Sequence, residues 1–455
     1  MEKTIAAIST APAPGGIGIV RISGGEAFAV AEKVFRGVSG KKLSQMKGYT
    51  AQLGGAYTPA GEKLDDVVAL VYRGPKSYTG EDVVELSCHG GLYMTKRLLQ
   101  LVLDAGAAPA GPGEFTRRAF LNGKMDLAQA EAVMGLISAS GEQARKAALA
   151  GSTGVLSRKI KSIKQGLLEQ AAHLAAWADF PEEDVPQVEE AALLEGIRQG
   201  EKALEELLQG FDRGRMYREG LVTVIAGRPN AGKSTLMNLL SGCQRSIVTQ
   251  YAGTTRDVVE ETVMVAGVPL RLADTAGIRD TDDPVESIGV QAARQRLETA
   301  QLVLAVFDSS QALEKEDWEL MDALEKVPAI AIVNKSDLPT RMDVEAIQKR
   351  FEKTVSLSAA TGEGLAALEQ ALSEILDTKD FHPQEGVLFT QRQRMDAQTA
   401  LDSLREGEQA LVLGLTLDAV TVCVEDALHA LAALTGEQVS EEIVDRVFEE
   451  FCVGK

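Results

Sequence analysis

Residues 227–234 read GRPNAGKS, and this stretch decides the fold of the chain. It fits the pattern GxxxxGK[ST], follows the β-branched run VTVIAG, and leads into the helical stretch TLMNLLSG. A glycine-rich turn between a strand and a helix points backbone N–H groups at phosphate oxygens, which the helix dipole also favours. Taken alone, the pattern also fits an ATPase or a chance match.

Within this motif we expect Lys233 to reach the β- and γ-phosphates of a nucleotide and Ser234 to bind Mg²⁺. The phosphate-binding residues predicted from this stretch are Asn230, Ala231, Gly232, Lys233, Ser234 and Thr235.

Three later motifs, each at the carboxyl end of an expected strand, indicate a guanine nucleotide. The carboxylate of Asp337 in NKSD can accept the N1–H and N2–H of guanine, which adenine does not present together. An open, doubly wound α/β sheet binds its ligand at the carboxyl ends of its strands, which is where these motifs lie. Four motifs in this order and at these places exclude a chance match to the first one. The predicted GTP-binding residues are Asp274, Thr275, Ala276 and Gly277 of DTAG, Asn334, Lys335 and Asp337 of NKSD, and Ser358, Ala359 and Ala360 of SAA.

The loop TQYAGTTRD at 249–257 lies between the first two motifs. We expect Thr255 to complete the Mg²⁺ shell, although a plain Gly/Thr loop is the alternative. Ile278 follows the DTAG glycine and cannot polarise water, so the group that orients the attacking water must come from elsewhere. Glu286 can do so from its loop, or it can simply be a first-turn helix carboxylate.

The rest of the chain surrounds this α/β unit. Residues 1–120 mix short β-branched runs with Gly/Pro turns and one helical stretch at 92–105, which predicts a small α+β domain. Residues 121–215 and 378–455 have helical spacing, and the strands and helices of 216–377 lie between them. The predicted fold class is therefore a doubly wound P-loop domain inserted into an all-α domain and preceded by an α+β domain.

The charge, cysteine content and hydrophobicity of the chain limit its possible functions and location further. The net charge of −19 is the wrong sign for a protein that coats nucleic acid, so RNA binding requires a local basic patch. The segment 145–164 has six basic residues and no acidic one, and is either such a contact or a solvated helix face. No secretory signal or membrane-spanning run is recognised, so we expect a cytoplasmic protein without a membrane partner. The scattered cysteines, Cys88, Cys243, Cys423 and Cys452, indicate reduced thiols rather than a disulfide framework or zinc site.

The motifs GRPNAGKS, TQYAGTTRD, DTAGIR, NKSD and SAATGEG together resemble the translation-factor-related GTPases, and within them the tRNA-modification GTPase MnmE (TrmE) family. The N-terminal stretches YTGEDVVELSCHGG and PGEFTRRAFLNGKMDLAQAEAV and the final FCVGK match that family as well. The resemblance implies a K⁺-assisted GTPase activated by G-domain dimerisation, with Glu286 orienting the water. The K⁺ ligands it implies are Asn230, Thr249, Tyr251 and Thr254, of which Thr249 and Thr254 also count among the GTP-binding residues.

For the N-terminal domain the resemblance implies a reduced-folate site for 5-formyl- or methylene-tetrahydrofolate. The implied ligands are Arg21, Glu85, Lys124 and Lys455. On spacing alone, the first three would be surface or ion-pair residues, and GGIG at 15–18 would be a turn into a strand. Cys452 is either a frayed-end thiol or a site residue, because the family's tail reaches the folate pocket.

The implied function is wobble-uridine modification of tRNA by a homodimer that works with a FAD-containing partner resembling MnmG (GidA). GTP hydrolysis would drive opening and closing of paired G domains. Two alternatives stay open from the sequence: a regulatory or ribosome-assembly GTPase without folate, and a folate-dependent transferase that is catalytic alone.

Overall fold

A computed structural model of the chain describes residues 3–179, 190–242, 261–272, 300–376, 382–449 and 451–454. The chain divides into two compact units. The first comprises residues 1–134, 160–194 and 402–455, and the second comprises 135–159 and 195–401. No helix in the described ranges is both long enough and apolar enough to cross a membrane.

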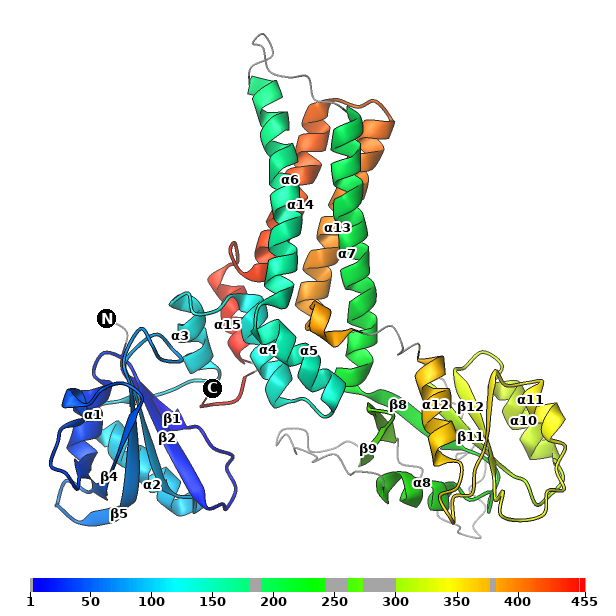
Figure 1. The fold of residues 1–455 in the computed structure, drawn as a ribbon, viewed down its shortest axis with the longest axis horizontal. Coiled ribbons are helices and arrows are strands. Elements are labelled where there is room, and N and C mark those ends of the chain that lie inside the picture. The colour runs from blue at the N-terminus through cyan, green and yellow to red at the C-terminus, as the bar shows by residue number, and fades with distance from the viewer. Residues whose placement is uncertain are drawn as a thin grey trace. The chain divides into compact units, whose positions relative to one another are not determined.

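The N-terminal part of the first unit is built on a seven-stranded sheet in the order β3-β4-β5-β6-β2-β1-β7 (Figure 1). Its neighbouring strands are antiparallel except for β1 and β7. The strands are β1 (Ile5–Ile8), β2 (Ile17–Ser23), β3 (Phe35–Gly37), β4 (Thr50–Tyr57), β5 (Lys63–Tyr72), β6 (Val83–His89) and β7 (Ala108–Pro109).

One face of this sheet carries α1 (Ala27–Val34) and α2 (Leu92–Asp104), and a short 3₁₀ turn, η1 (Leu43–Gln45), closes its edge. Val20 and Ile22 of β2 and Leu86 of β6 are fully buried in the core between sheet and helices. Side chains alternate along a strand, so Arg21 points to the opposite face. The alternation thus places the charged residues of β2 and β6 away from the core.

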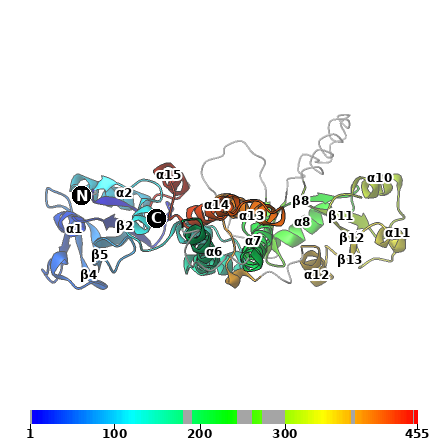
Figure 2. The same ribbon diagram turned by 90° about the horizontal axis from the view of Figure 1, so that it is seen from above.

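Helices make up most of the remaining chain outside the second sheet. They are α3 (Glu114–Leu121), α4 (Leu127–Ile137), α5 (Glu142–Ser152), α6 (Val155–Asp179), α7 (Glu190–Glu219), α13 (Gln391–Val412), α14 (Leu417–Thr435) and α15 (Glu441–Glu449), with the 3₁₀ turn η3 (Pro383–Glu385). Within the first unit, Figures 1 and 2 show α6 beside α14, and Lys164 of α6 pairs with Glu437 just after α14 at 2.6 Å.

The second unit contains a six-stranded sheet in the order β13-β12-β11-β8-β10-β9. All neighbouring pairs are parallel except β9 and β10. The strands are β8 (Leu221–Ala226), β9 (Glu261–Val265), β10 (Val268–Leu272), β11 (Leu302–Asp308), β12 (Ala329–Asn334) and β13 (Lys353–Ser356).

The helices of this part are α8 (Lys233–Gly242), α10 (Lys315–Ala323), α11 (Val344–Gln348) and α12 (Leu365–Ile375). Met321 of α10 and Ile347 of α11 belong to the core of one sheet face, together with Phe307. Figure 2 shows α10 and α12 on opposite sides of the sheet. Parallel strands covered on both faces read as continuous apolar runs, and every residue of β11 is buried.

The predicted fold class is confirmed: an α+β region, helices and a doubly wound sheet follow one another along the chain. One element differs from expectation. The run TVMVAGVPLRLAD predicts a single strand, but the structure turns it into the β9–β10 hairpin at Ala266 and Gly267. Their φ angles of 51° and 77° suit a tight two-residue hairpin turn, which the strand-like letters on either side conceal.

Candidate functional site

The turn after β8 has the backbone of a phosphate-binding loop. Gly227, Asn230 and Gly232 have φ angles of 155°, 62° and 97°, and α8 begins at Lys233. Successive turns of this kind orient N–H groups into an anion-binding concavity. A Cβ on Gly227 would lie 2.4 Å from the carbonyl oxygen of Val306, so this position accepts only glycine. The Lys233 ammonium donates to the carbonyls of Gly227 and Arg228 at 2.9 and 2.7 Å, and thus lies over the loop.

Asn334 joins three of the predicted motifs. Its Nδ2 donates to the carbonyl of Ala231 at 2.8 Å, and its Oδ1 accepts from the backbone N–H of Ala359 at 2.9 Å. The residue is 1% exposed, so both bonds are shielded from water. A Cβ on Gly232 would lie 2.2 Å from Asn334 Nδ2, which makes this glycine necessary for the junction. Motifs more than a hundred residues apart therefore form one structural unit.

The carboxylate of Asp337 is anchored through one of its oxygens. Its Oδ1 accepts from the Ser358 hydroxyl at 2.6 Å, and the side chain remains exposed. Ser358 Oγ in turn accepts from the N–H of Thr361 at 3.3 Å. Ala360 is exposed next to the buried Ala359. This arrangement orients one carboxylate oxygen and leaves the other able to accept hydrogen bonds from a ligand.

Asp308, the last residue of β11, was not predicted as a site residue. Its Oδ2 lies 2.6 Å from the ammonium of Lys335, and its Oδ1 accepts from both the N–H and the hydroxyl of Ser310. Burial of Asp308 opposes its ionisation, but the hydrogen bonds from Lys335 and Ser310 outweigh burial and hold the pKa of Asp308 below its ordinary value. The Ser309 hydroxyl donates to the carbonyl of Lys335 at 3.0 Å. The side chain of Lys335 is thereby fixed by Asp308 and its backbone carbonyl by Ser309. Its backbone has a left-handed φ of 63°.

Arg228, the second residue of the loop, was also not singled out. Its guanidinium pairs with Glu314 at 2.7 Å and with Asp317 at 2.8 Å. These two acids form the capping box at the N-terminus of α10. Because Asp317 is 2% exposed, it is a buried anchor, and it fixes the phosphate-binding loop to the start of α10.

The residues suited to a metal ion at this site are only partly described. Ser234 and Thr235 are exposed in the first turn of α8, and a hydroxyl oxygen is the hard ligand that Mg²⁺ takes. Among the described residues, no group of three or more His, Cys, Asp or Glu side chains could hold a metal. Nine residues predicted for the nucleotide site and its metal ions lie outside the described ranges: Thr249, Tyr251, Thr254, Thr255, Asp274, Thr275, Ala276, Gly277 and Glu286.

A second polar site lies on the open face of the N-terminal sheet. Arg21 and Glu85 are register partners on β2 and β6, and their side chains pair at 2.8 Å. The Tyr72 hydroxyl donates to Glu85 at 3.3 Å, and burial beside that carboxylate raises the pKa of Tyr72. The guanidinium of Arg21 also lies 5.5 Å from the ring centre of Phe115, a distance typical of a cation–π contact.

The end of the chain reaches this same site. The Gly454 carbonyl accepts from Arg21 at 3.4 Å and from the Ser9 hydroxyl at 3.0 Å. Val453 forms an antiparallel bridge with Pro112, and Cys452 is exposed. Gly454 has a φ of 99°, and an added Cβ would lie 2.2 Å from the Ile8 carbonyl, so the docked tail needs glycine there. Lys455 lies outside the described residues.

Lys124 does not join this pair directly. Its ammonium donates to the carbonyl of Pro75 at 2.9 Å, and no described hydrogen bond or ion pair joins it to Arg21 or Glu85. Pro75 belongs to the same loop as Tyr78, whose ring lies 5.8 Å from the Arg21 guanidinium. The structure therefore brings together Arg21, Glu85 and the C-terminal tail. Lys124 instead contacts the adjoining loop that contains Pro75 and Tyr78.

The basic segment 145–164 is partly paired with carboxylates within the molecule. Arg145 pairs with Glu142 at 2.7 Å, and Lys146 lies 3.8 Å from the same carboxylate. Lys164 pairs with Glu437. Half of its six basic residues thus have carboxylate partners, which weakens the interpretation of this segment as an RNA contact.

The comparisons with known proteins cover the whole chain. A family model described as the MnmE helical domain matches residues 127–452, and one described as the GTP-binding protein TrmE N-terminus matches 4–124. The tRNA modification GTPase MnmE of Alkaliphilus oremlandii is 43% identical over 100% of both chains, and that of Symbiobacterium thermophilum is 45% identical over 100% of both. Among solved structures, the G domain of the T. maritima FeoB iron transporter is 26% identical, covering 34% of this chain and 98% of that one at a TM-score of 0.26. The chain belongs to the MnmE family of tRNA modification GTPases.

Proposed function

We propose that this chain hydrolyses GTP and uses the hydrolysis to drive modification of the wobble uridine of tRNA. The observation that carries the proposal is the junction at Asn334, which joins the phosphate-binding loop at Ala231 to the base-binding backbone at Ala359. A site built in this way binds the phosphates and the base of one guanine nucleotide. Asp337 then selects guanine over adenine.

Hydrolysis itself needs little covalent chemistry from the protein, because positioning and charge stabilisation supply most of the rate. Lys233 and the loop N–H groups would hold the phosphates, while Ser234 and Thr255 would hold Mg²⁺. K⁺ held by Asn230, Thr249, Tyr251 and Thr254 would offset charge that develops in the transition state. Glu286 would orient the attacking water, because Ile278 cannot.

The N-terminal site is proposed to bind a reduced folate, as 5-formyl- or methylene-tetrahydrofolate. A carboxylate such as Glu85 can accept the amine hydrogens of a pterin, and cations such as Arg21, Lys124 and Lys455 suit a glutamate tail or a pterin carbonyl. Docking of the tail supports this proposal, because it brings the Gly454 carbonyl, two residues after Cys452, within 3.4 Å of Arg21. Cys452 would then be a site residue rather than a frayed-end thiol.

The acting species is proposed to be a cytoplasmic homodimer in complex with a FAD-containing, MnmG-like partner. The partner's flavin would supply the redox chemistry, and the folate would supply the carbon that becomes an aminomethyl-type group at uridine C5. Dimer contacts through the N-terminal domain would hold two G domains at high local concentration. Nucleotide-driven opening and closing of those domains would then change the conformation of the modification site.

The experiment that tests the proposal adds methylenetetrahydrofolate and the flavoprotein partner separately to the purified chain with unmodified tRNA, GTP and an amine source, either ammonium or glycine. Modification that requires both, together with GTP hydrolysis, is the expected result. A chain that shows no folate binding would instead be a regulatory GTPase, and one that modifies tRNA without a flavoprotein would be a self-sufficient transferase. Either result would contradict the proposal.

A further inference from the structure

Five basic side chains gather at one edge of the N-terminal sheet, where α1, β3 and η1 follow one another. They are Lys33, Arg36, Lys41, Lys42 and Lys47, and all five are exposed. We call this set the basic edge. No ion pair joins any of them to a carboxylate in the part of the chain that the structure describes, and the one acid among them, Glu32, accepts the N–H of Ser44 at 2.7 Å. In a chain of net charge −19, this edge is a local concentration of uncompensated positive charge.

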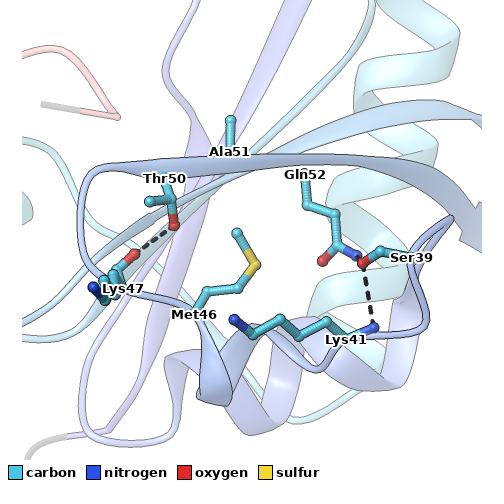
Figure 3. A pocket seen from close by; sticks show the side chains of 7 residues that line it. All are labelled: Ser39, Lys41, Met46, Lys47, Thr50, Ala51 and Gln52. Atoms are coloured by element: carbon cyan, nitrogen blue, oxygen red, sulfur yellow. Dashed lines mark hydrogen bonds between the residues drawn. The ribbon is translucent and has the colours of Figure 1, made fainter.

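The basic edge surrounds two hollows in the surface. One has a volume of about 290 Å³ and is lined by Ser39, Lys41, Met46, Lys47, Thr50, Ala51 and Gln52. The other has a volume of about 460 Å³, shares Lys41 with the first, and has Lys33, Arg36 and Lys42 in its lining. In Figure 3 the side chain of Lys41 runs along the first hollow toward Met46, while Lys47 lies at the far end beside Thr50. The cations therefore border concave surface that a chain of phosphates can follow.

The first hollow also offers polar groups that can read a sugar or base. The Gln52 side-chain amide contacts the Ser39 hydroxyl through Nε2, and its Oε1 is a buried acceptor without a hydrogen-bond partner among the described residues. Ser39, Thr50 and Gln52 line the hollow, so hydroxyl and amide groups lie among the cations that border it.

An exposed aromatic ring follows the basic edge along the chain. Tyr49, between Lys47 and Thr50, is 65% exposed although its backbone is held in the left-handed region, with a φ of 61°. Its N–H donates to the Val71 carbonyl at 2.7 Å, and its ring packs edge-on against Tyr72, whose hydroxyl donates to Glu85. A fixed, exposed aromatic ring two residues after Lys47 offers a surface on which an unpaired nucleotide base can stack.

We infer that the basic edge and Tyr49 form an RNA-binding surface, which holds a phosphate backbone with its cations and stacks one base on Tyr49. The inference deepens the proposed function, on which it rests, because it gives tRNA a contact surface on this chain. The contacts from Tyr49 through Tyr72 to Glu85 place the ring of Tyr49 on the same sheet face as the site proposed for folate. Of the two basic regions, the basic edge is favoured because half of the cations of segment 145–164 are paired with carboxylates, whereas, among the described residues, those of the basic edge are not.

The test measures binding of fluorescent tRNA to the full-length protein over a range of salt concentrations. The triple variant K41Q/K42Q/K47Q should bind more weakly, and the salt slope of its log affinity should fall by about two to three, since each phosphate contact contributes roughly 0.7–0.9. The matched control, R145Q/K146Q/K164Q, removes the same charge from paired positions and should leave the slope nearly unchanged. Tyr49→Ala should weaken binding about fivefold or more, and Tyr49→Phe should not. GTP hydrolysis by every variant verifies that the chain is folded.

Three results would overturn the inference. The first is wild-type tRNA affinity and slope in the triple variant, and the second is an equal loss in the control. The third is displacement of tRNA by polyglutamate or by phosphatidylserine vesicles at the same charge concentration, which would mean that the edge attracts any polyanion. The proposed function fails separately: it fails if wobble uridines are unchanged in cells lacking the gene, whatever the binding result.

Discussion

Replacement of Asp308 by asparagine tests whether the base-binding loop depends on the ion pair behind it. The substitution keeps the shape of the side chain but removes the charge that lies 2.6 Å from Lys335. Since Asp308 is only 4% exposed and also accepts from Ser310, the change acts on a defined, mostly dry contact. The Lys335 ammonium would lose its ion pair, while the Lys335 carbonyl would keep the hydrogen bond from the Ser309 hydroxyl.

A hydrogen bond between charged groups contributes about 1.5–3 kcal/mol. Lys335 is 30% exposed, so water partly replaces the lost partner, and the lower figure of about 1.5 kcal/mol applies. Affinity for GTP should therefore fall about tenfold. Affinity for GDP should fall by the same factor, because the pair lies on the base side of the site and not at the phosphates.

Titration with fluorescent GTP and GDP analogues measures both affinities. Asp322→Asn is the matched control, because that carboxylate pairs with Arg350 but is 66% exposed, and it should change affinity by less than about twofold. Unchanged affinity in Asp308→Asn, or a loss confined to GTP, would refute the reasoning. In the wild type, the lowered pKa of Asp308 means that its contribution is complete above the ordinary carboxyl pKa of about 4 and is lost as the pH falls through the folded value.

Three further predictions concern other parts of the molecule. Gly454→Ala should undock the tail and abolish binding of 5-formyltetrahydrofolate without affecting GTP hydrolysis, because the added Cβ would lie 2.2 Å from the Ile8 carbonyl. Gly61→Ala, also at a left-handed glycine but with nothing within 4 Å, is its control, and equal folate affinities in the two variants would contradict the docking. Arg218→Ala removes a partly buried guanidinium that donates to the Leu388 carbonyl at 2.8 Å and stacks on Phe211 and Phe389. It should lower the free energy of unfolding by about 2–4 kcal/mol in chemical denaturation, whereas Arg215→Ala, which removes an exposed pair with Glu219, should lower it by less than about 1 kcal/mol. GTP hydrolysis should be fast in K⁺ and slow in Na⁺ at equal ionic strength, and equal rates would exclude the proposed monovalent-cation site.

The convergence of the predicted motifs follows from the order of the strands. The carboxyl ends of parallel strands share one edge of a sheet, so GRPNAGKS, NKSD and SAA had to meet there. The sequence does not reveal which of those strands are neighbours. Asp308 escaped prediction for this reason: it becomes a partner of Lys335 only because β11 lies beside β12, with Asp308 opposite Asn334. Arg228 escaped because its partners begin a helix more than eighty residues later.

The N-terminal site shows a different limit. Spacing alone favours an ion pair for Arg21 and Glu85, and the structure contains that pair. An ion pair on an open sheet face does not by itself identify a ligand, so the folate role stays a prediction that rests on the family resemblance. The basic edge was missed because its five cations are interleaved with buried residues such as Val34 and Leu43, which hides their common surface in a linear reading.

The central claim is that nucleotide hydrolysis by this chain drives tRNA modification. Mass analysis of tRNA nucleosides tests it most directly, in cells that lack the gene and carry either the wild-type chain or Lys233→Ala. Modified wobble uridines should disappear without the gene, return with the wild type, and stay absent with Lys233→Ala, which removes the ammonium over the phosphate-binding loop. Unchanged wobble uridines in the deletion strain, or full restoration by Lys233→Ala, would contradict it.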